Sequence, residues 1–254
     1  MLFLILFIVC IFLLIYMYIE ANRNRVNQIN TEINRLPVSF HDFKIFFVSD
    51  IHRRIIQDSV IEKARAADIV IIGGDLAEKG VPIERVKHNL MKLKKIGPSY
   101  FVWGNNDYEL NTTELCDTIQ DCGVKIIKNG CISLEQGNEI IDIAAVDDLS
   151  LKKDDLRQAL ATSYSSCKIL ISHNPDIVKK INKKDNISLV LSGHTHGGQI
   201  RLGPLGIAKR GGWYAGDSCQ LFISNGYGTR HLPLRLGAQS ETNLITLKQV
   251  KSLH

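Results

Sequence analysis

The chain lacks the cysteine spacing of a disulfide framework or of a cysteine-bound metal cluster. It has six cysteines, of which Cys10 lies in the apolar N-terminal segment and five lie in the rest of the chain. None of them belongs to a C-x-x-C pair. An odd number without paired spacing argues against structural disulfides and cysteine zinc sites, and it fits a reducing compartment.

Internal repeats, long Gly/Ser or Pro runs, and a basic stripe with interleaved aromatic residues are also missing. Without a break in composition, residues 41–254 are long enough to form one domain with a proper core. Nucleic-acid grooves need aligned cations and stacking aromatics, so we do not expect a nucleic-acid partner. No obligate protein partner is indicated, and the net charge of +5 is modest.

Charge is absent from residues 1–19, which are almost entirely Leu, Ile, Phe, Val, Met and Tyr. At about 1.5 Å per residue, such a helix just crosses a hydrocarbon core of roughly 30 Å. A cleaved signal peptide would carry Lys or Arg before the apolar run and a small-x-small site after it. Neither is present. We therefore predict an uncleaved membrane anchor.

Arg23, Arg25 and Arg35 follow the apolar segment, while the amino terminus is the only basic group before it. The positive-inside rule then predicts a single-pass membrane protein whose catalytic domain lies in the cytoplasm. Residues 20–40 are polar and rich in Asn and Arg. We expect them to form a tether between the anchor of residues 1–19 and the folded domain of residues 41–254.

Short apolar runs alternate with amphipathic ones through residues 41–254, which is the pattern of an α/β fold. Pro82 and the Gly97-Pro98 pair bound one of the expected helices. We expect strands at 44–49, 69–72, 100–103, 125–127, 139–144, 168–172, 189–192, 219–224 and 244–247. We expect helices at 58–66, 83–95, 151–161 and 175–181.

Five of these strands run into side chains that bind metals, at the C-terminal ends where open α/β sheets build their sites. In chain order they end in Asp50-Ile51-His52, Gly74-Asp75, Gly104-Asn105-Asn106-Asp107, His173-Asn174 and Gly193-His194-Thr195-His196. In an extended segment, the two rings of an H-x-H pair point the same way. Five such endings in a chain with only eight His residues indicate one common site.

Carboxylate, amide oxygen and neutral imidazole together select divalent transition metals such as Mn, Fe, Zn or Co. Seven ligands are too many for one ion, and they suit two divalent ions a few Å apart that clamp a phosphate between them. The candidate metal ligands are Asp50, His52, Asp75, Asn105, His173, His194 and His196.

The motif order D-x-H, G-D, G-N, H and G-H-x-H resembles the calcineurin-like metallophosphoesterase family over nearly all of residues 41–247. Residues 194–200 and 228–235 are similar to the bacterial membrane-associated branch that includes the YkuE and YaeI-type phosphoesterases. The resemblance implies a four-layer α/β/β/α sandwich, in which two mixed sheets pack face to face and helices cover both outer faces.

The resemblance also implies how the ligands are divided and what they do. A metal-bound hydroxide would attack a phosphodiester or pyrophosphate in line. One ion would be held by Asp50, His52 and His196 and the other by Asn105, His173 and His194, with Asp75 as the bridge.

One position departs from the family pattern, which usually reads G-N-H where this chain has Gly104-Asn105-Asn106. An amide donates a hydrogen bond but is not a general acid near neutral pH. The absence of a general acid slows the cleavage of poor leaving groups most. We therefore predict phosphodiester or pyrophosphate substrates rather than alkyl phosphomonoesters. We expect Asn106 to assist catalysis and Asp107 to orient Asn106 or a ligand histidine.

We expect the substrate, a phosphorylated small molecule or lipid, to meet Gln199, Arg201, Arg230 and His231, since planar Arg suits phosphate. Asp147 and Asp148 fit either a chemical role or a solvated turn. Two alternatives to the phosphohydrolase stay open. One is a lipid-linked (nucleotide-lipid) pyrophosphatase, and the other is a non-catalytic scaffold on a phosphoesterase fold, which would hold no metal.

Overall fold

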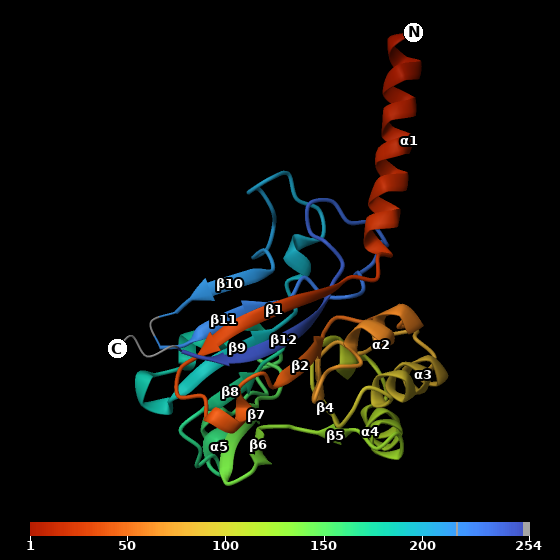
Figure 1. The fold of residues 1–254 in the computed structure, drawn as a ribbon. Helices are drawn as coiled ribbons and strands as arrows, with labels where there is room; N and C mark the ends of the chain where they lie inside the picture. The colour runs from red at the N-terminus through yellow and green to blue at the C-terminus, as the bar shows by residue number, and fades with distance from the viewer. Residues whose placement is uncertain (217, 251–254) are drawn as a thin grey trace.

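Two six-stranded mixed β-sheets pack face to face in the computed structural model, which describes residues 1–216 and 218–250 (Figure 1). The first sheet, in spatial order, contains β1 (Val26–Ile33), β12 (Thr242–Gln249), β2 (Lys44–Val48), β3 (Ile69–Gly73), β4 (Ser99–Val102) and β5 (Lys125–Ile126). The second contains β10 (Gly212–Ala215), β11 (Gln220–Ile223), β9 (Ile187–Ser192), β8 (Lys168–Ile171), β7 (Glu139–Ala145) and β6 (Gly130–Gln136).

Helices cover the outer face of each sheet. The first sheet is covered by α2 (Asp58–Ala64), α3 (Ile83–Lys94) and α4 (Thr112–Asp121), and the second by α5 (Leu156–Leu160) and the 3-10 helix η3 (Pro175–Lys180). The other 3-10 turns are η1 (Val38–Phe40), η2 (Asn106–Glu109), η4 (Lys183–Asp185) and η5 (His196–Gly198). The predicted four-layer sandwich of two mixed sheets is confirmed.

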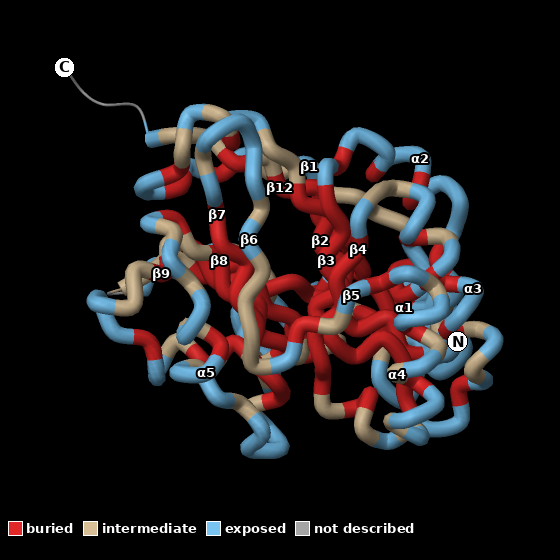
Figure 2. Tube along the Cα trace, turned by 90° about the horizontal axis from the view of Figure 1, so that it is seen from below, coloured by how far each residue is buried: buried red, intermediate tan, exposed pale blue. Residues whose placement is uncertain are grey.

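Strand β2 shows why the central strands are continuous apolar runs. Ile45 and Phe47 pack between the two sheets, whereas Phe46 and Val48 pack against the helices outside the first sheet. All four side chains are buried, because both faces of the strand are covered. Figure 2 shows the same burial along β3 and β4 of the first sheet and along β7 and β8 of the second.

Parallel pairing brings the predicted strand ends to one edge of the sandwich. Strands β2, β3 and β4 are parallel neighbours in the first sheet, as are β7, β8, β9 and β11 in the second. Each of these strands therefore ends at the same side of its sheet, and the loops that follow them form a single cluster.

Several expected elements differ from those in the structure. The segment predicted as a tether over residues 20–40 contains β1, which pairs in parallel with β12. Helix α4 and strands β6 and β10 were not predicted, and α5 is shorter than the helix expected at 151–161. The Asn and Gln residues of β1 hid it from the hydrophobic pattern, since only Thr31 and Ile33 of this strand are buried.

Helix α1 (Leu2–Ala21) projects from the domain and is long and apolar enough to cross a membrane (Figure 1). Its last turns are not free. Met17 and Ala21 are buried, and the Met17 carbonyl accepts a hydrogen bond of 3.0 Å from the backbone N–H of Arg235. Glu20 is also buried and pairs with Arg23 and Arg25. The base of the helix is thus part of the folded domain.

Candidate metal centre

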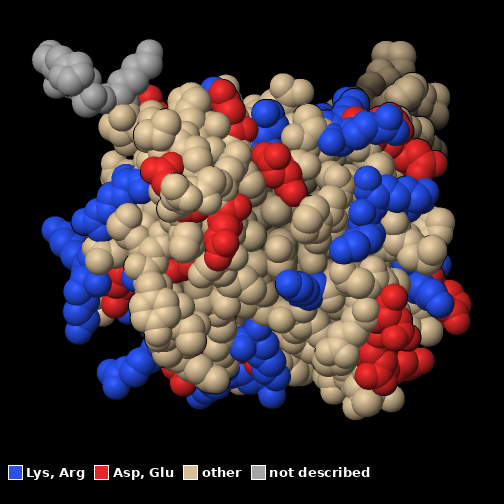
Figure 3. Space-filling view, turned by 60° about the horizontal axis from the view of Figure 1, so that its bottom comes forward, with Lys and Arg blue, Asp and Glu red and all other residues tan. Residues whose placement is uncertain are grey.

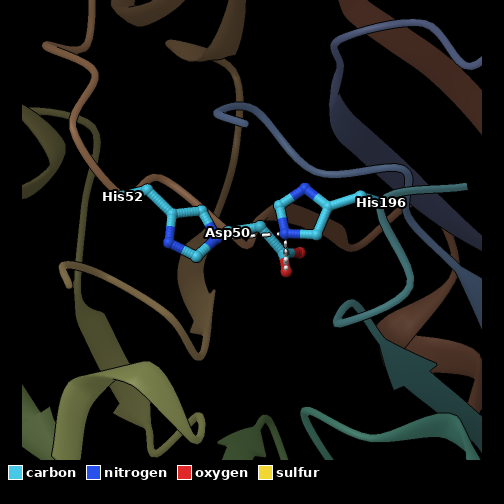
Figure 4. A group of neighbouring side chains, drawn as sticks. All are labelled: Asp50, His52 and His196. Carbon is cyan, nitrogen blue, oxygen red and sulfur yellow. Dashed lines mark hydrogen bonds and ion pairs between the residues drawn. The ribbon is translucent and has the colours of Figure 1, made fainter. Parts of the chain in front are cut away.

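One group of predicted ligands comes from the loops after β2 and β9. The Nε2 atoms of His52 and His196 are 3.0 Å apart, and His196 Nε2 is 3.3 Å from Asp50 Oδ1 (Figure 4). All three side chains are buried. The carboxylate of Asp50 also accepts the backbone N–H of His194, at 3.0 Å to Oδ1, which fixes the start of the H-x-H segment.

A second group lies directly beside the first and shares Asp50 with it. It contains Asp50, Asp75 and His173, all buried. Asp75 Oδ2 lies 3.2 Å from His173 Nε2 and 3.7 Å from His52 Nε2. Asp75 therefore lies between the histidines of the two groups. Its other oxygen accepts the backbone N–H of Asn106 at 2.8 Å.

The buried side-chain atoms at this site without a hydrogen-bond partner of good geometry include Asn105 Oδ1 and His173 Nε2. Each residue is held from its other side. Asn105 Nδ2 donates to Asn106 Oδ1, and His173 Nδ1 lies 2.9 Å from the Gly73 carbonyl. The His194 ring packs edge-on to His173, with 5.0 Å between centroids. Buried acceptors left open in this way fit a second divalent ion.

The electrostatics of the site also favour cations. Burial alone would lower the pKa of His173, but the charge of Asp75 raises that pKa to about 10. The carboxylates thus create a field that favours positive charge beside His173, whether that charge is a proton or a bound metal ion. By contrast, burial and then the charges of His52 and Arg235 hold the pKa of His196 well below its usual value. The His196 ring is therefore neutral, the form that binds metals.

The backbone at the site is held in an unusual conformation. Asp50, His52, Asp75, His194 and His196 all have positive φ, between 50° and 71°. Such conformations cost of order 1–3 kcal/mol each in non-glycine residues and cluster at functional sites. Close packing leaves no room for a side chain at Gly74, whose Cβ would lie 2.6 Å from His173 Nδ1.

Asp107 supports Asp75 rather than Asn106 or a histidine. Its Oδ2 accepts the backbone N–H groups of Asp75 and Gly104 at 2.8 and 2.9 Å, and its Oδ1 accepts that of Ala77 at 3.2 Å. Burial and the charge of Asp75 raise the pKa of Asp107 to about 7. Asn106 is also buried, and its side-chain carbonyl orients Asn105.

Glu78 is a supporting residue that the sequence motifs did not reveal. It is 6% exposed, its Oε2 lies 3.0 Å from His52 Nδ1, and its Oε1 accepts from Arg53. The His52 hydrogen bond, opposed by partial burial and assisted by Arg53, lowers the pKa of Glu78 to about 2. Glu78 therefore stays charged and holds the His52 ring with Nε2 facing the site.

We expect Glu78→Gln to weaken divalent metal binding about 10- to 100-fold, the usual cost of removing a partner that orients a ligand. Titration of the metal-free protein with Mn²⁺ by calorimetry measures the effect. Glu62→Gln, at an exposed position of α2, is the matched control and should leave the affinity unchanged. Equal affinities of the Glu78→Gln variant and the wild type would contradict this role.

Arg235 is a fully buried cation behind the site that the motifs also did not single out. Its guanidinium lies 3.4 Å from His196 Nδ1, and burial lowers its pKa to about 10. It donates to the carbonyls of His196, Asn225, Gly226, Gly228, Ala238 and Gln239. The loop carrying His196 and the two loops after β11 are therefore tied to one side chain.

Asp147 and Asp148, which follow β7, are buried, so the solvated turn is excluded. The Tyr108 hydroxyl donates to Asp147 at 2.8 Å, linking the loop after β4 to the second sheet. Asp148 Oδ2 is buried without a hydrogen-bond partner, and burial raises the pKa of Asp148.

A pocket of about 530 Å³ opens in front of the H-x-H segment. Three of the four predicted substrate residues, Gln199, Arg230 and His231, line it with His194 and His196. Arg201 does not. Its guanidinium is inside a loop and donates to the carbonyls of Gly197, Pro204 and Ala208. These contacts give Arg201 a structural part instead of the predicted contact with substrate.

Residues 43–198 match the model of the calcineurin-like phosphoesterase family. The Bacillus subtilis (strain 168) protein YpbG is 45% identical over 207 residues, covering 80% of each chain. The metallophosphoesterase YkuE of the same organism is 29% identical, covering 91% of this chain and 88% of its own. Among solved structures, Thermus thermophilus sulfate thiohydrolase SoxB aligns with a TM-score of 0.57 at 12% identity, over 84% of this chain and 57% of that chain, which shows a shared fold.

Proposed function

Since this chain belongs to the calcineurin-like phosphoesterase family, we propose that it is a membrane-anchored phosphohydrolase that uses two metal ions to cleave phosphodiester or pyrophosphate bonds. The observation that carries the proposal is the pair of buried Asp/His groups that share Asp50. The ligands in them come from the loops after β2, β3, β8 and β9, and contacts behind them hold them in position. A fold that had lost its activity would have no reason to maintain this strained arrangement.

The two groups support five of the seven assigned ligands, namely Asp50, His52, Asp75, His173 and His196. Ions such as Mn, Fe, Zn or Co would be held by Asp50, His52 and His196 on one side and by Asn105, His173 and His194 on the other, with Asp75 between them. When bound, such ions polarise phosphoryl oxygens and lower the pKa of water. The alternative of a scaffold without activity requires a folded protein that holds no metal, so a measured content of about two ions per chain separates the two.

Arg230 and Asn106 indicate which phosphate bonds this chain can cleave. Arg230 lies at the pocket and supplies a cation for the phosphate. Asn106 has no proton to give to a leaving oxygen, and its side-chain carbonyl already accepts from Asn105. General-acid help is worth about 100- to 10,000-fold, so a leaving group that needs none is favoured. Aryl, nucleotide and pyrophosphate leaving groups meet that condition.

The direct test compares bis-p-nitrophenyl phosphate with p-nitrophenyl phosphate, using the purified chain with added Mn²⁺. We expect the higher kcat/KM on the diester. A higher kcat/KM on the monoester would refute the proposed substrate preference. Absence of hydrolysis on both, by a protein that holds two ions, would leave the phosphohydrolase itself unsupported.

Asn106→His should add the missing acid. We expect kcat/KM for an alkyl phosphomonoester such as glycerol phosphate to rise by about 100-fold, the lower end of general-acid contributions. The diester rate should change much less. Asn106→Ala is the matched control, because it also disturbs Asn105 but supplies no proton. If the histidine variant gains no more than the alanine variant while metal content is equal, the missing acid is not what limits monoester cleavage.

A lipid-linked pyrophosphatase is the second candidate, favoured by the apolar helix beside the site. We infer that α1 is retained as an anchor, because Met17 and Ala21 are buried in the domain and removal of the helix would expose their contacts. We further infer that the folded unit begins at β1 and that it faces the cytoplasm, on the charges of Arg23, Arg25 and Arg35.

A further inference from the structure

We propose that two loops beside α1 insert into the bilayer surface, so that the metal pocket opens among lipid headgroups and takes the phosphate of a membrane lipid. The substrate part of this inference rests on the proposed phosphohydrolase function. The feature that carries it is an apolar rim of exposed side chains. The rim consists of Ile200, Leu202, Leu205, Ile207 and Leu232, which are 47, 69, 73, 94 and 66% exposed.

The loop that carries most of the rim is held rigidly. Leu202 and Leu205 exchange backbone hydrogen bonds of 3.0 and 3.1 Å around a tight turn. Arg201 fills the inside of the loop and donates to three of its carbonyls. Because polar contacts occupy the interior, the leucine side chains stay outside and do not fold back onto the domain. Apolar side chains held out in this way match a bilayer surface better than water.

Both loops are joined to each other and to the base of α1. The Gln199 side chain accepts the backbone N–H of Arg230 and lies 3.4 Å from the carbonyls of Leu232 and Leu234. The same second loop contains Arg235, whose backbone N–H bonds the Met17 carbonyl. The rim, the second loop and the last turns of α1 therefore form one continuous body.

This body lies at the level where α1 would leave the hydrocarbon. In Figure 1 the loop before β12 lies beside the last turns of α1, and the loop before β10 lies beyond it, on the same side of the domain as the helix. Contact with Met17 means that the loop carrying Arg235 flanks the helix before its end at Ala21, and Gln199 joins the other loop to it. If α1 spans the bilayer, the rim must sit at or within the headgroup layer on that side.

The charges around the rim suit that position. Lys209, Arg210 and Arg230 are exposed close to it in the chain, where they would meet lipid phosphates. The opposite face, turned forward in Figure 3, instead carries Lys, Arg, Asp and Glu scattered over its surface. A mixed charged face is typical of a surface in contact with water. Residues 200–211 and 228–236, by contrast, contain Lys and Arg but no Asp or Glu.

The rim and the metal pocket share residues. Ile200 and Ile207 line the pocket of about 530 Å³ together with His194, His196 and Arg230. A lipid phosphate can therefore reach the ligands while its acyl chains remain beside the apolar rim. A soluble substrate would need no apolar wall at the mouth of the pocket. The geometry thus favours a phosphate ester or pyrophosphate carried by a membrane lipid.

Insertion is tested with the full chain in phosphatidylcholine bilayers whose acyl chains carry bromine, which quenches tryptophan on contact. The fluorescence of the tryptophan introduced by Leu205→Trp is obtained by subtracting the wild-type signal from Trp103 and Trp213. We expect this fluorescence to be blue-shifted and to be quenched by the brominated lipid. Leu202→Trp is a second probe in case the first variant does not fold. Met91→Trp, at an exposed apolar position of α3, is the matched control. Quenching at the rim no stronger than at residue 91 would overturn the insertion.

The substrate part is tested separately, with a non-hydrolysable lipid phosphonate in the same bilayer as the enzyme. It should raise KM for bis-p-nitrophenyl phosphate without lowering kcat, and the double variant Leu202→Asn/Leu205→Asn should lose this sensitivity while keeping its rate on the soluble diester. An unchanged KM in the wild type would overturn access by lipid phosphate. Loss of diester hydrolysis in the wild type would instead count against the proposed function, so the two failures are distinguishable.

Discussion

Asp75→Asn is expected to lower kcat/KM for bis-p-nitrophenyl phosphate by about a thousandfold or more. The carboxylate lies between the histidines of the two ligand groups, so a neutral amide would weaken both ion sites at once. Paired ions contribute several kcal/mol to transition-state stabilisation, and each 1.36 kcal/mol corresponds to tenfold in rate. Steady-state kinetics with saturating Mn²⁺ and metal analysis of the purified variant measure the loss.

The substitution is nearly isosteric, which makes the result interpretable. An asparagine at position 75 can still accept the backbone N–H of Asn106, and its own N–H can still donate to Asp107. The circular dichroism spectrum of the metal-free variant should therefore match that of the wild type. Asp117→Asn, at an exposed position of α4, should retain full activity. Retention of both metals and most of the activity by Asp75→Asn would show that Asp75 does not bridge.

Arg235→Met should produce the largest loss of stability. The change leaves up to six buried carbonyl groups without their donor, and an unsatisfied buried group costs about 1–3 kcal/mol. Even with partial relaxation, we expect a loss of at least about 4 kcal/mol in the free energy of unfolding. For a chain of this size that corresponds to a fall in Tm of at least about 10 °C.

Arg230→Met is the control. It removes an arginine from the same loop but leaves the buried hydrogen bonds of Arg235 in place, so it measures the effect of losing the charge alone. Arg230 is exposed, so its replacement should change the free energy of unfolding by less than about 0.5 kcal/mol. Differential scanning calorimetry of both variants in the same detergent measures the difference. Similar Tm values for the two variants would show that the six carbonyl contacts of Arg235 contribute little.

The site could be predicted from the sequence because each ligand directly follows a strand. An apolar run that ends in Asp50 or His173 is visible in a few residues, and the parallel pairing that gathers such ends follows from the α/β pattern. Continuous apolar runs also indicated the burial of the central strands. The fold class therefore depended on local signals that the chain repeats many times.

The bonding partners of the supporting residues could not be predicted in the same way. Asp107 bonds the backbone of Asp75, 32 residues earlier, and Arg235 bonds the carbonyl of His196, 39 residues earlier. Neither contact leaves a periodic trace in sequence, since each depends on loops that meet only after the sheets have packed. Arg201 shows the converse, because a loop arginine beside a metal motif suggests a phosphate contact until its guanidinium is seen to bond its own loop.

The pairing of β1 with β12 also has a consequence for biosynthesis. Strand β12 lies between β1 and β2 in the first sheet, so β1 has no hydrogen-bonded neighbour among strands made earlier than residue 242. The ribosome must therefore produce nearly the whole chain before this sheet can close. Contacts so distant in sequence form slowly. If α1 enters the bilayer as it emerges, the unpaired edge of β1 waits at the membrane surface throughout translation, where a chaperone that covers open strand edges would be most useful.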